Sequence, residues 1–366
     1  MPETIAEGSR APAGQEATIA DFARPSLPNG QGRFALVFGG GNALGAYHAG
    51  AYEILERQGL QPDWVVGASI GAVTAAIIAG NAPGERVAKL RRFWHEAAQH
   101  TAPNLIDALK PRQFYNGLHA LLALLYGRPS LYQHRFPGLW SALPWLPNDV
   151  ALFDNRPLLR TLAELVDFER LNSGETRLTV ACVDIETSEE VTFDSTCQEI
   201  RPEHILASTA ILPAFPPVEI EGRQFCDAGY VNNLPLDPVF ANEPDDDLFC
   251  VALELFSPRA PRPASLDAVL ERANDMIFSS AGRRSMAALA REYALRQRLK
   301  PDGPKVRLLH LAYRATADEL AAKSFEYSPS SIRDRWEAGG RDMDRGLALL
   351  LESRPSENRF AYLPLT

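Results

Sequence analysis

Apolar and polar positions along the chain predict strands and helices that follow one another. A short apolar run at residues 34–38 ends in glycine, which is typical of a buried strand. Residues 43–58 then carry apolar side chains at helical spacing and stop at Gly59, a residue type favoured just after a helix. A second strand at 63–66 and a strongly apolar helix at 70–78 repeat this order. The alternation predicts parallel strands joined by right-handed crossovers.

The rest of the chain predicts more elements of both kinds and contains no internal repeat. The pattern indicates an amphipathic helix at 84–99 and a β-hairpin at 177–184 and 190–193. Further strands are predicted at 218–220, 224–226, 249–255 and 305–311, and further helices at 265–300 and 331–351. These elements favour an α/β fold.

Composition divides the chain into three parts. Residues 1–32 are rich in Ala, Glu, Gly, Pro and Ser without periodicity, which predicts a disordered N-terminal tail. Residues 33–257 are expected to form the main domain, and residues 258–366 a C-terminal extension packed on it. An insertion at about 101–150 is rich in aromatic residues, leucine and proline. It is either an irregular subdomain packed on the core or a cap over an apolar site that also touches lipid.

Charge and cysteine usage narrow the class of protein. The 366 residues carry a formal net charge of −9, which argues against a general nucleic-acid binder. The cysteines are far apart in sequence and predict neither a disulfide framework nor a zinc site. No apolar run reaches the roughly 18 residues of a membrane-spanning helix, and the N-terminus lacks a secretory signal pattern. We therefore expect a cytoplasmic protein with reduced cysteines, at positions Cys182, Cys197, Cys226 and Cys250.

Residues 67–71, with the sequence GASIG, place Ser69 between the second predicted strand and the helix that follows it. A sharp strand-to-helix turn strains the serine backbone, and glycine two positions to either side removes the clashes. The hydroxyl would then stand at a helix N-terminus, whose partial positive charge favours a developing anion. Ser69 is therefore a candidate nucleophile, and the alternative is a serine that only caps the helix.

Three consecutive glycines at 39–41 and a fourth at Gly45 follow the first predicted strand. Spacing excludes two nucleotide-binding motifs. Leu44 stands where a dinucleotide fingerprint needs its third glycine, and Ala46 stands where a P-loop needs lysine. What remains is a run of backbone N–H groups at a helix start, which can receive an oxyanion. Tight packing of helix on strand is the alternative reason for the glycines.

A serine nucleophile needs a base, and two residues are candidates. Asp227 ends an apolar run and enters a turn of small residues, although an aspartate there is often only a turn former. His310 would fit the Ser–Asp–His order of α/β-hydrolases, but it lies within a predicted strand. Only two strands precede Ser69, fewer than that fold usually has before its nucleophile. These observations favour Asp227.

Together these residues resemble the patatin-like phospholipase family. Four blocks occur in that family's order within about residues 34–242: the glycine-rich loop 39–45, the GASIG turn, the stretch ASTAILPAFPPV and the acid motif DAG at 227–229. The stretch PDWVVGASIGAVTAAIIAGN is most similar to a bacterial subgroup with an additional C-terminal region of unknown role, which would begin here near Pro258.

The resemblance implies a three-layer α/β/α fold with a mostly parallel central sheet, in which 33–257 is the catalytic domain. It also implies a Ser–Asp dyad, with Ser69 as nucleophile, Asp227 as general base, an acyl-enzyme intermediate and no metal or cofactor. The implied oxyanion hole consists of the backbone N–H groups of Gly39, Gly40, Gly41 and Ile70. The implied supporting glycines of the turns are Gly67, Gly71 and Gly229.

The chain departs from the family pattern at two positions. Leu44 stands where the family usually has an arginine, which puts the preference for phospholipid in question. Ala228 stands where the family more often has glycine. If that position required a positive φ, alanine would be strained there.

The expected function is that of a carboxylic-ester hydrolase, a serine lipid acyl hydrolase acting on phospholipid, glyceride or another hydrophobic ester. Two alternatives stay open: a thioesterase or polyester or short-chain esterase on the same dyad, and a non-catalytic lipid-binding or scaffold protein. The expected partner is the lipid substrate and not nucleic acid. A peripheral contact with the inner membrane face and a homo-oligomer are both left open.

Overall fold

The computed structural model describes residues 32–99, 112–143, 146–316, 318–352 and 358–365. The strands are β1 Arg33–Phe38, β2 Trp64–Ala68, β3 Gln133–His134, β4 Phe153–Asp154, β5 Arg177–Asp184, β6 Glu190–Asp194, β7 Val218–Ile220, β8 Arg223–Asp227, β9 Leu248–Glu254, β10 Val306–Ala312 and β11 Phe360–Leu365. The α-helices are α2 Ala46–Arg57, α3 Ile70–Ala79, α4 Arg86–Ala98, α5 Arg112–Tyr126, α6 Pro157–Leu165, α7 Phe168–Asn172, α8 Pro202–Ser208, α9 Gly229–Asn232, α10 Asp237–Phe240, α11 Leu266–Leu299 and α12 Pro329–Glu352. Short 3₁₀ helices are η1 Asn42–Gly45, η3 Gly138–Ala142 and η4 Lys323–Phe325.

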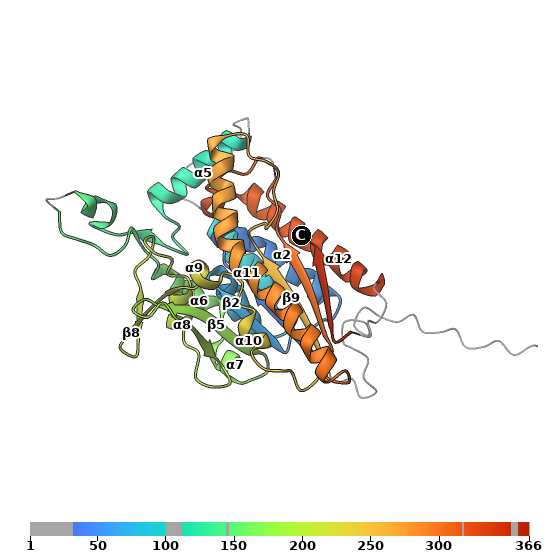
Figure 1. The fold of residues 1–366 in the computed structure, drawn as a ribbon. Helices are drawn as coiled ribbons and strands as arrows, with labels where there is room; N and C mark the ends of the chain where they lie inside the picture. The colour runs from blue at the N-terminus through green and yellow to red at the C-terminus, as the bar shows by residue number, and fades with distance from the viewer. Residues whose placement is uncertain (1–31, 100–111, 144–145, 317, 353–357, 366) are drawn as a thin grey trace, which may run out of the picture.

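One large sheet runs through the molecule in the strand order β11-β10-β9-β1-β2-β5-β8-β7, with β6 also paired to β5 (Figure 1). Every pair from β11 to β5 is parallel. The pairs that β5 makes with β6 and β8, and the pair of β7 with β8, are antiparallel. The sheet is therefore parallel through its centre and antiparallel at one end.

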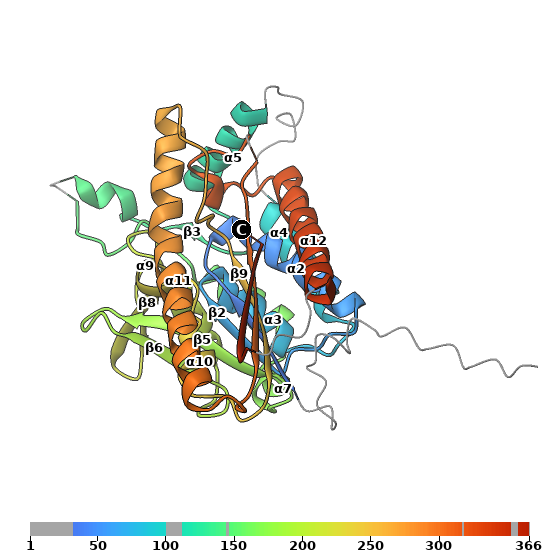
Figure 2. The same cartoon turned by 45° about the vertical axis from the view of Figure 1, so that its right-hand side comes forward.

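Helices cover both faces of this sheet, as the alternation of side chains along β1 requires. Phe34 and Leu36 pack into a core with buried residues of α2, α3 and α12. Ala35 and Val37 point to the other face and pack with buried residues of α10 and α11. Figure 2 shows α11 and α12 on opposite sides of the strands around β9. The predicted three-layer α/β/α fold with a mostly parallel sheet is confirmed.

The C-terminal part of the chain enters the same sheet as the N-terminal part. β10 pairs with β9, and β11 pairs with β10 at the edge. The sequence pattern predicts β10 but not β11, whose run includes Pro364. Proline lacks a backbone N–H and is tolerated in an edge strand, because one side of that strand is unpaired. Residues beyond 258 thus supply strands to the sheet and α11 and α12 to its two faces.

The aromatic-rich insertion contains a helix that the sequence pattern does not predict. In α5 the buried residues Tyr115, His119, Ala120 and Ala123 recur at helical spacing, whereas Phe114 and Tyr126 are exposed. The predicted tail 1–32, apart from Gly32, lies outside the described residues. None of the helices within the described ranges has the combination of length and apolarity that crossing a bilayer requires.

Candidate functional site

Ser69 lies in a tight turn between β2 and α3, with φ of 56° and ψ of −127°. Both flanking glycines are needed for this turn. A Cβ at Gly67 would lie 2.4 Å from the carbonyl carbon of Gly71, and a Cβ at Gly71 would lie 2.2 Å from the Phe38 carbonyl oxygen. The Ser69 N–H donates to the Ser208 hydroxyl at 2.9 Å. Steric requirements and this hydrogen bond hold the serine in a conformation that costs backbone strain energy.

The register of the sheet brings Asp227 to the level of Ser69. Ala68, the last residue of β2, pairs with Ala181 of β5, and the next residue of β5, Cys182, pairs with Asp227 at the end of β8. One strand therefore separates Ser69 from Asp227, although the two residues are far apart in sequence. Their side chains line the same cavity.

The Asp227 carboxyl group is buried and only partly hydrogen-bonded. Its Oδ1 accepts the N–H of Gly229 at 2.7 Å. Among the described residues, Oδ2 has no hydrogen-bond partner of ordinary geometry. Burial raises the pKa of Asp227 to about 6, against the opposing effects of the nearby Ser69 hydroxyl and the Gly229 N–H. Ala228 has φ of −69°, so alanine is not strained at this position of the acid motif.

The first two glycine amides of the loop after β1 are already paired within the fold. The Gly39 N–H donates to the Leu253 carbonyl and the Gly40 N–H to the Asn233 carbonyl, both at 3.0 Å. The Asn233 side chain returns a hydrogen bond to the Gly40 carbonyl at 3.1 Å. The N–H groups of Gly39 and Gly40 are therefore engaged in holding the loop, which the predicted oxyanion role does not anticipate.

The other two predicted amides, those of Gly41 and Ile70, are free in the described part of the chain. Both residues line the cavity that contains Ser69. Gly40 allows the loop to approach the serine, because a Cβ there would lie 3.0 Å from the Ser69 Cβ and 2.4 Å from the Asn233 Oδ1. Ile70 is the first residue of α3, so its N–H lies at the positive end of the helix dipole.

The cavity that Ser69 and Asp227 share has a volume of about 550 Å³ and mostly apolar walls. Its inner wall consists of buried side chains, namely Val73, Phe93, Leu131, Tyr132, Leu158 and Phe215. Its outer wall includes the exposed side chains of Tyr230 and Leu270 together with Asn274 and Ser324. α11 and η4 form part of this wall, so the C-terminal region helps to build the cavity.

The remaining candidates of the sequence analysis lie away from the cavity. Leu44 is fully buried in the core and does not line the cavity. His310 is buried in β10, with Nε2 3.1 Å from the Glu254 carboxylate and Nδ1 2.9 Å from the Tyr362 hydroxyl. Its ring nitrogens are thus occupied by partners outside the Ser69 cavity.

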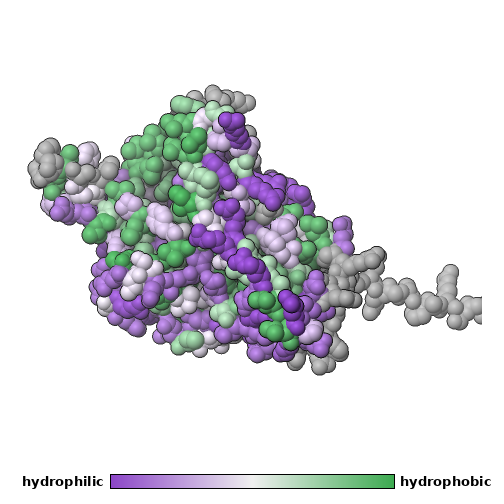
Figure 3. Space-filling view, in the orientation of Figure 1, coloured by the Kyte–Doolittle hydropathy of each residue, from purple (hydrophilic) through white to green (hydrophobic). Residues whose placement is uncertain are grey.

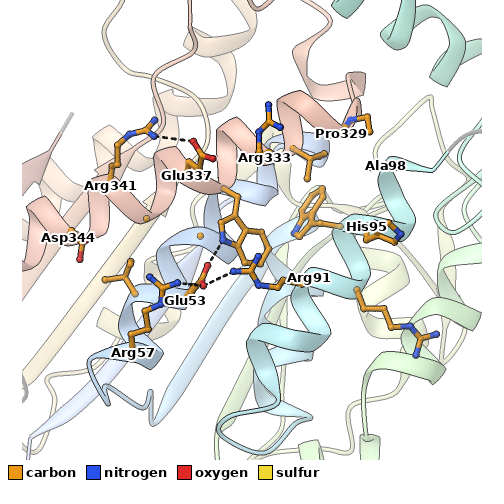
Figure 4. Close-up of a pocket in the computed structure, with 17 residues that line it drawn as sticks. Glu53, Arg57, Arg91, His95, Ala98, Pro329, Arg333, Glu337, Arg341 and Asp344 are labelled. Carbon is orange, nitrogen blue, oxygen red and sulfur yellow. Dashed lines mark hydrogen bonds and ion pairs between the residues drawn. The ribbon is translucent and has the colours of Figure 1, made fainter. Parts of the chain in front are cut away.

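A second and larger cavity of about 960 Å³ lies between α2, α4 and α12 and contains none of the predicted site residues (Figure 4). Its centre is the Glu53 carboxylate, which accepts from Arg57, Arg91 and Trp336. Burial raises the pKa of Glu53, but the hydrogen bonds from Trp336 and Arg91 outweigh it, and the pKa is lowered. Five arginines and three acids line this groove, and the described part of its lining contains no serine, threonine or cysteine, so it offers no hydroxyl or thiol nucleophile.

Sequence reasoning gave no role to several residues that shape the site. Ser208 accepts the Ser69 N–H and donates to the Ala181 carbonyl at 2.7 Å. Asn233 holds the glycine loop, and Phe278 of α11 lines the cavity. Ser208 lies in the ASTAILPAFPPV block and Asn233 follows the acid motif. Their positions beside these motifs could have identified them as part of the site. Phe278 had no such signal.

Comparison with known proteins agrees with these motifs. Residues 36–240 match a family model described as Patatin-like phospholipase, and residues 283–358 match a second model described as Patatin phospholipase. Lysophospholipase NTE1 of Saccharomyces cerevisiae is 26% identical over 214 residues, which is 55% of this chain and 10% of that protein. Patatin-like phospholipase domain-containing protein 6 of Homo sapiens is 32% identical over 92 residues, 25% of this chain and 7% of that protein. The chain thus spans a tenth or less of the length of these curated relatives.

Two solved structures are similar over most of the chain. The crystal structure of VipD from Legionella pneumophila aligns with a TM-score of 0.42 and 16% identity, over 87% of this chain and 67% of that one. Human GIVD cytosolic phospholipase A2 aligns with a TM-score of 0.41 and 12% identity, over 92% of this chain and 63% of that one. The first family model spans more than half of the chain and includes both Ser69 and Asp227. The chain therefore belongs to the patatin-like phospholipase family.

Proposed function

We propose that this chain is a serine lipid acyl hydrolase in which Ser69 and Asp227 form the catalytic dyad. One observation carries the proposal: a strained serine at a helix N-terminus and a buried carboxyl group with a free oxygen line one apolar cavity. A strained nucleophile, a positioned base and an apolar pocket together favour acyl transfer from a hydrophobic ester.

In the acylation step, the Ser69 hydroxyl attacks the ester carbonyl carbon and its proton passes to Asp227 Oδ2. The tetrahedral oxyanion would accept hydrogen bonds from the free N–H groups of Gly41 and Ile70. Such a donor typically stabilises the transition state by about 2.7–4 kcal/mol. The C–O bond to the alcohol then breaks, and the alcohol leaves with the proton that Asp227 returns.

In the deacylation step, Asp227 accepts a proton from water as the water oxygen attacks the acyl carbon of the Ser69 ester. The same two amides would hold the second oxyanion. When it collapses, the bond to Ser69 Oγ breaks, Asp227 returns the proton to the serine and the fatty acid leaves. The buried inner wall of the cavity is suited to the acyl chain, because it removes apolar surface from water.

The substrate of such an enzyme lies in a lipid phase, and the proposal includes a peripheral membrane contact. Leu270 of α11 is exposed and lines the cavity, and α11 carries further exposed apolar residues beside α5, which also exposes apolar side chains (Figures 1 and 2). We propose that this face meets the lipid surface.

Labelling with a fluorophosphonate probe tests the dyad. We expect the wild-type chain to be labelled covalently and the Ser69→Ala variant not to be labelled, because the probe phosphonylates an activated serine. Ser173→Ala, which removes an exposed serine hydroxyl, serves as the matched control and should label like the wild type. Equal labelling of Ser69→Ala, or no labelling of the wild type, would contradict the proposed function and favour a non-catalytic protein.

A further inference from the structure

The polar side chains that line the Ser69 cavity are neutral amides and hydroxyls. Apart from Ser69 they are Asn42, Tyr132, Asn155, Thr209, Tyr230, Asn233, Asn274 and Ser324. Within the described residues, the cavity wall contains one ionisable acid, Asp227, and no lysine, arginine or histidine. As the base of the proposed reaction, Asp227 is ionised when the enzyme is active. The reaction therefore takes place beside a buried negative charge.

One lysine beside the cavity wall is held by two acids. Lys323 lies between the wall residues Ala322 and Ser324, but its side chain is buried. Its ammonium group lies 2.9 Å from a carboxylate oxygen of Glu271 and 2.9 Å from one of Asp275, both in α11. These partners hold the cation in place, 6.0 Å from the ring centre of the wall residue Phe256, and compensate its charge. Lys323 therefore cannot form an ion pair with an anion in the cavity without breaking its ion pairs with Glu271 and Asp275.

The buried arginine on the inner side of the cavity is also directed elsewhere. Arg128 precedes the wall residues Leu131 and Tyr132 in sequence but does not itself line the cavity. Its guanidinium lies 5.0 Å from the centre of the Tyr327 ring, and its Nη1 approaches the backbone carbonyls of Ala98 and Gln99. Its charge thus faces the protein interior.

A glycerophospholipid brings its phosphate close to the reacting ester, because only a few covalent bonds separate the two groups. With its ester carbonyl at Ser69, its phosphate would lie in the outer part of this cavity. An anion there would be partly removed from water, would meet amide and hydroxyl groups instead of cations, and would be repelled by Asp227. An uncharged alcohol, such as glycerol, meets the same groups as ordinary hydrogen-bond partners.

From this arrangement we infer that the site selects uncharged esters, with acylglycerols as the substrate class, over esters that carry a phosphate. The inference rests on the proposed function. The reaction is plain hydrolysis: the ester C–O bond breaks, the water oxygen joins the acyl carbon, and the alcohol oxygen takes a proton. Selectivity arises because the site carries one negative charge throughout, first on Asp227 and then, once Asp227 has taken the serine proton, on the oxyanion. This charge leaves the outer cavity unfavourable for a further anion.

The test compares two esters with the same acyl chain, 1-oleoylglycerol and 1-oleoylglycerol 3-phosphate. Each is presented at the same mole fraction in micelles of an uncharged detergent, so that the lipid surface is matched. We expect kcat/KM to be at least about tenfold higher for the uncharged ester, since a partly desolvated anion without a cationic partner is disfavoured. Equal or faster hydrolysis of the phosphate ester overturns the inference.

A second test of the inference uses a variant with a cation at the outer wall of the cavity. Ser324→Arg places a guanidinium where the neutral hydroxyl stands, and Ser324→Gln is the uncharged control of similar reach. We expect Ser324→Arg to reduce the preference for 1-oleoylglycerol by at least about threefold and Ser324→Gln to leave the ratio of kcat/KM values as in the wild type. An unchanged ratio in a folded Ser324→Arg protein counts against the inference.

Labelling of Ser69 separates this inference from the proposed function. If the probe labels Ser69 and neither oleoyl ester is hydrolysed, the substrate class is wrong although the serine is active. If the probe labels no serine, the proposed function itself fails, and the selectivity fails with it.

Discussion

At the scale of single residues, the chemistry depends on the protonation state of Asp227. Its carboxyl group is buried at the end of β8, and burial raises its pKa to about 6. A raised pKa makes a carboxylate a stronger base toward a serine hydroxyl. With a pKa of about 6, the group is still ionised above about pH 6. The free Oδ2 and the bond from Gly229 to Oδ1 leave one oxygen available for the proton.

We predict that kcat/KM for a dissolved aryl ester rises with pH and reaches half of its maximum near the Asp227 pKa of about 6. Only the ionised carboxylate accepts the serine proton, so activity is lost as the pH falls below this value. Asp227→Asn should lower kcat by about 10²–10⁴-fold, because an amide cannot act as the base. A pH–rate profile of each protein is the measurement.

His310→Gln is the control for this profile. His310 bonds to Glu254 and Tyr362 outside the cavity, so the variant should keep the wild-type pH midpoint. A midpoint that disappears with His310→Gln, or full turnover by Asp227→Asn, would show that the base has been assigned wrongly.

At the scale of elements, two helices that are distant in sequence pack through glycines. α2 and α12 approach so closely that a Cβ at Gly50 would lie 1.8 Å from the Trp336 carbonyl oxygen. A Cβ at Gly339 would lie 1.9 Å from the Tyr47 carbonyl oxygen. At the neighbouring Gly340, the nearest atom to an added Cβ is 3.6 Å away, which is an ordinary contact. Adjacent glycines of one helix thus have different roles.

We predict opposite effects of alanine at these two neighbouring positions. Gly339→Ala should lower the free energy of unfolding by about 1–3 kcal/mol or more, because backbone atoms of α2 must move. Gly340→Ala should raise it by up to about 1 kcal/mol, because alanine favours the helix and finds space. Denaturant unfolding of both variants is the measurement, and equal shifts of the same sign would contradict the packing described.

At the scale of the whole molecule, apolar side chains gather on one exposed face. On α11 they are Leu266, Val269, Leu270, Met276 and Ile277, and on α5 they are Phe114, Leu121, Leu125 and Tyr126. We call these residues the mouth patch. Figure 3 shows apolar surface over α5 and the upper part of α11. Because Leu270 also lines the cavity, the patch reaches the cavity wall. Exposed apolar patches of this kind mark interaction surfaces.

We predict that the protein binds phosphatidylcholine vesicles through the mouth patch. Ile277→Glu should weaken vesicle binding at least about tenfold, because the variant places a charge against the lipid, while it retains turnover of a dissolved short ester. Leu295→Glu is the matched control: Leu295 is 59% exposed on the same helix and Ile277 is 51% exposed, but Leu295 lies outside the patch. Vesicle sedimentation is the measurement. Equal binding by both variants, or self-association in place of vesicle binding, would exclude a lipid role for the patch.

Most of the elements, the family and the candidate pair Ser69 and Asp227 can be predicted from the residues alone. These features depend on short-range rules: apolar periodicity sets the elements, and glycines on either side of Ser69 define the turn. Only the folded chain shows that the amides of Gly39 and Gly40 are paired while those of Gly41 and Ile70 stay free. It also accounts for the raised pKa of Asp227, the edge strand β11 and the contribution of α11 to the cavity. Each of these depends on contacts between residues far apart in the chain, which local patterns do not specify.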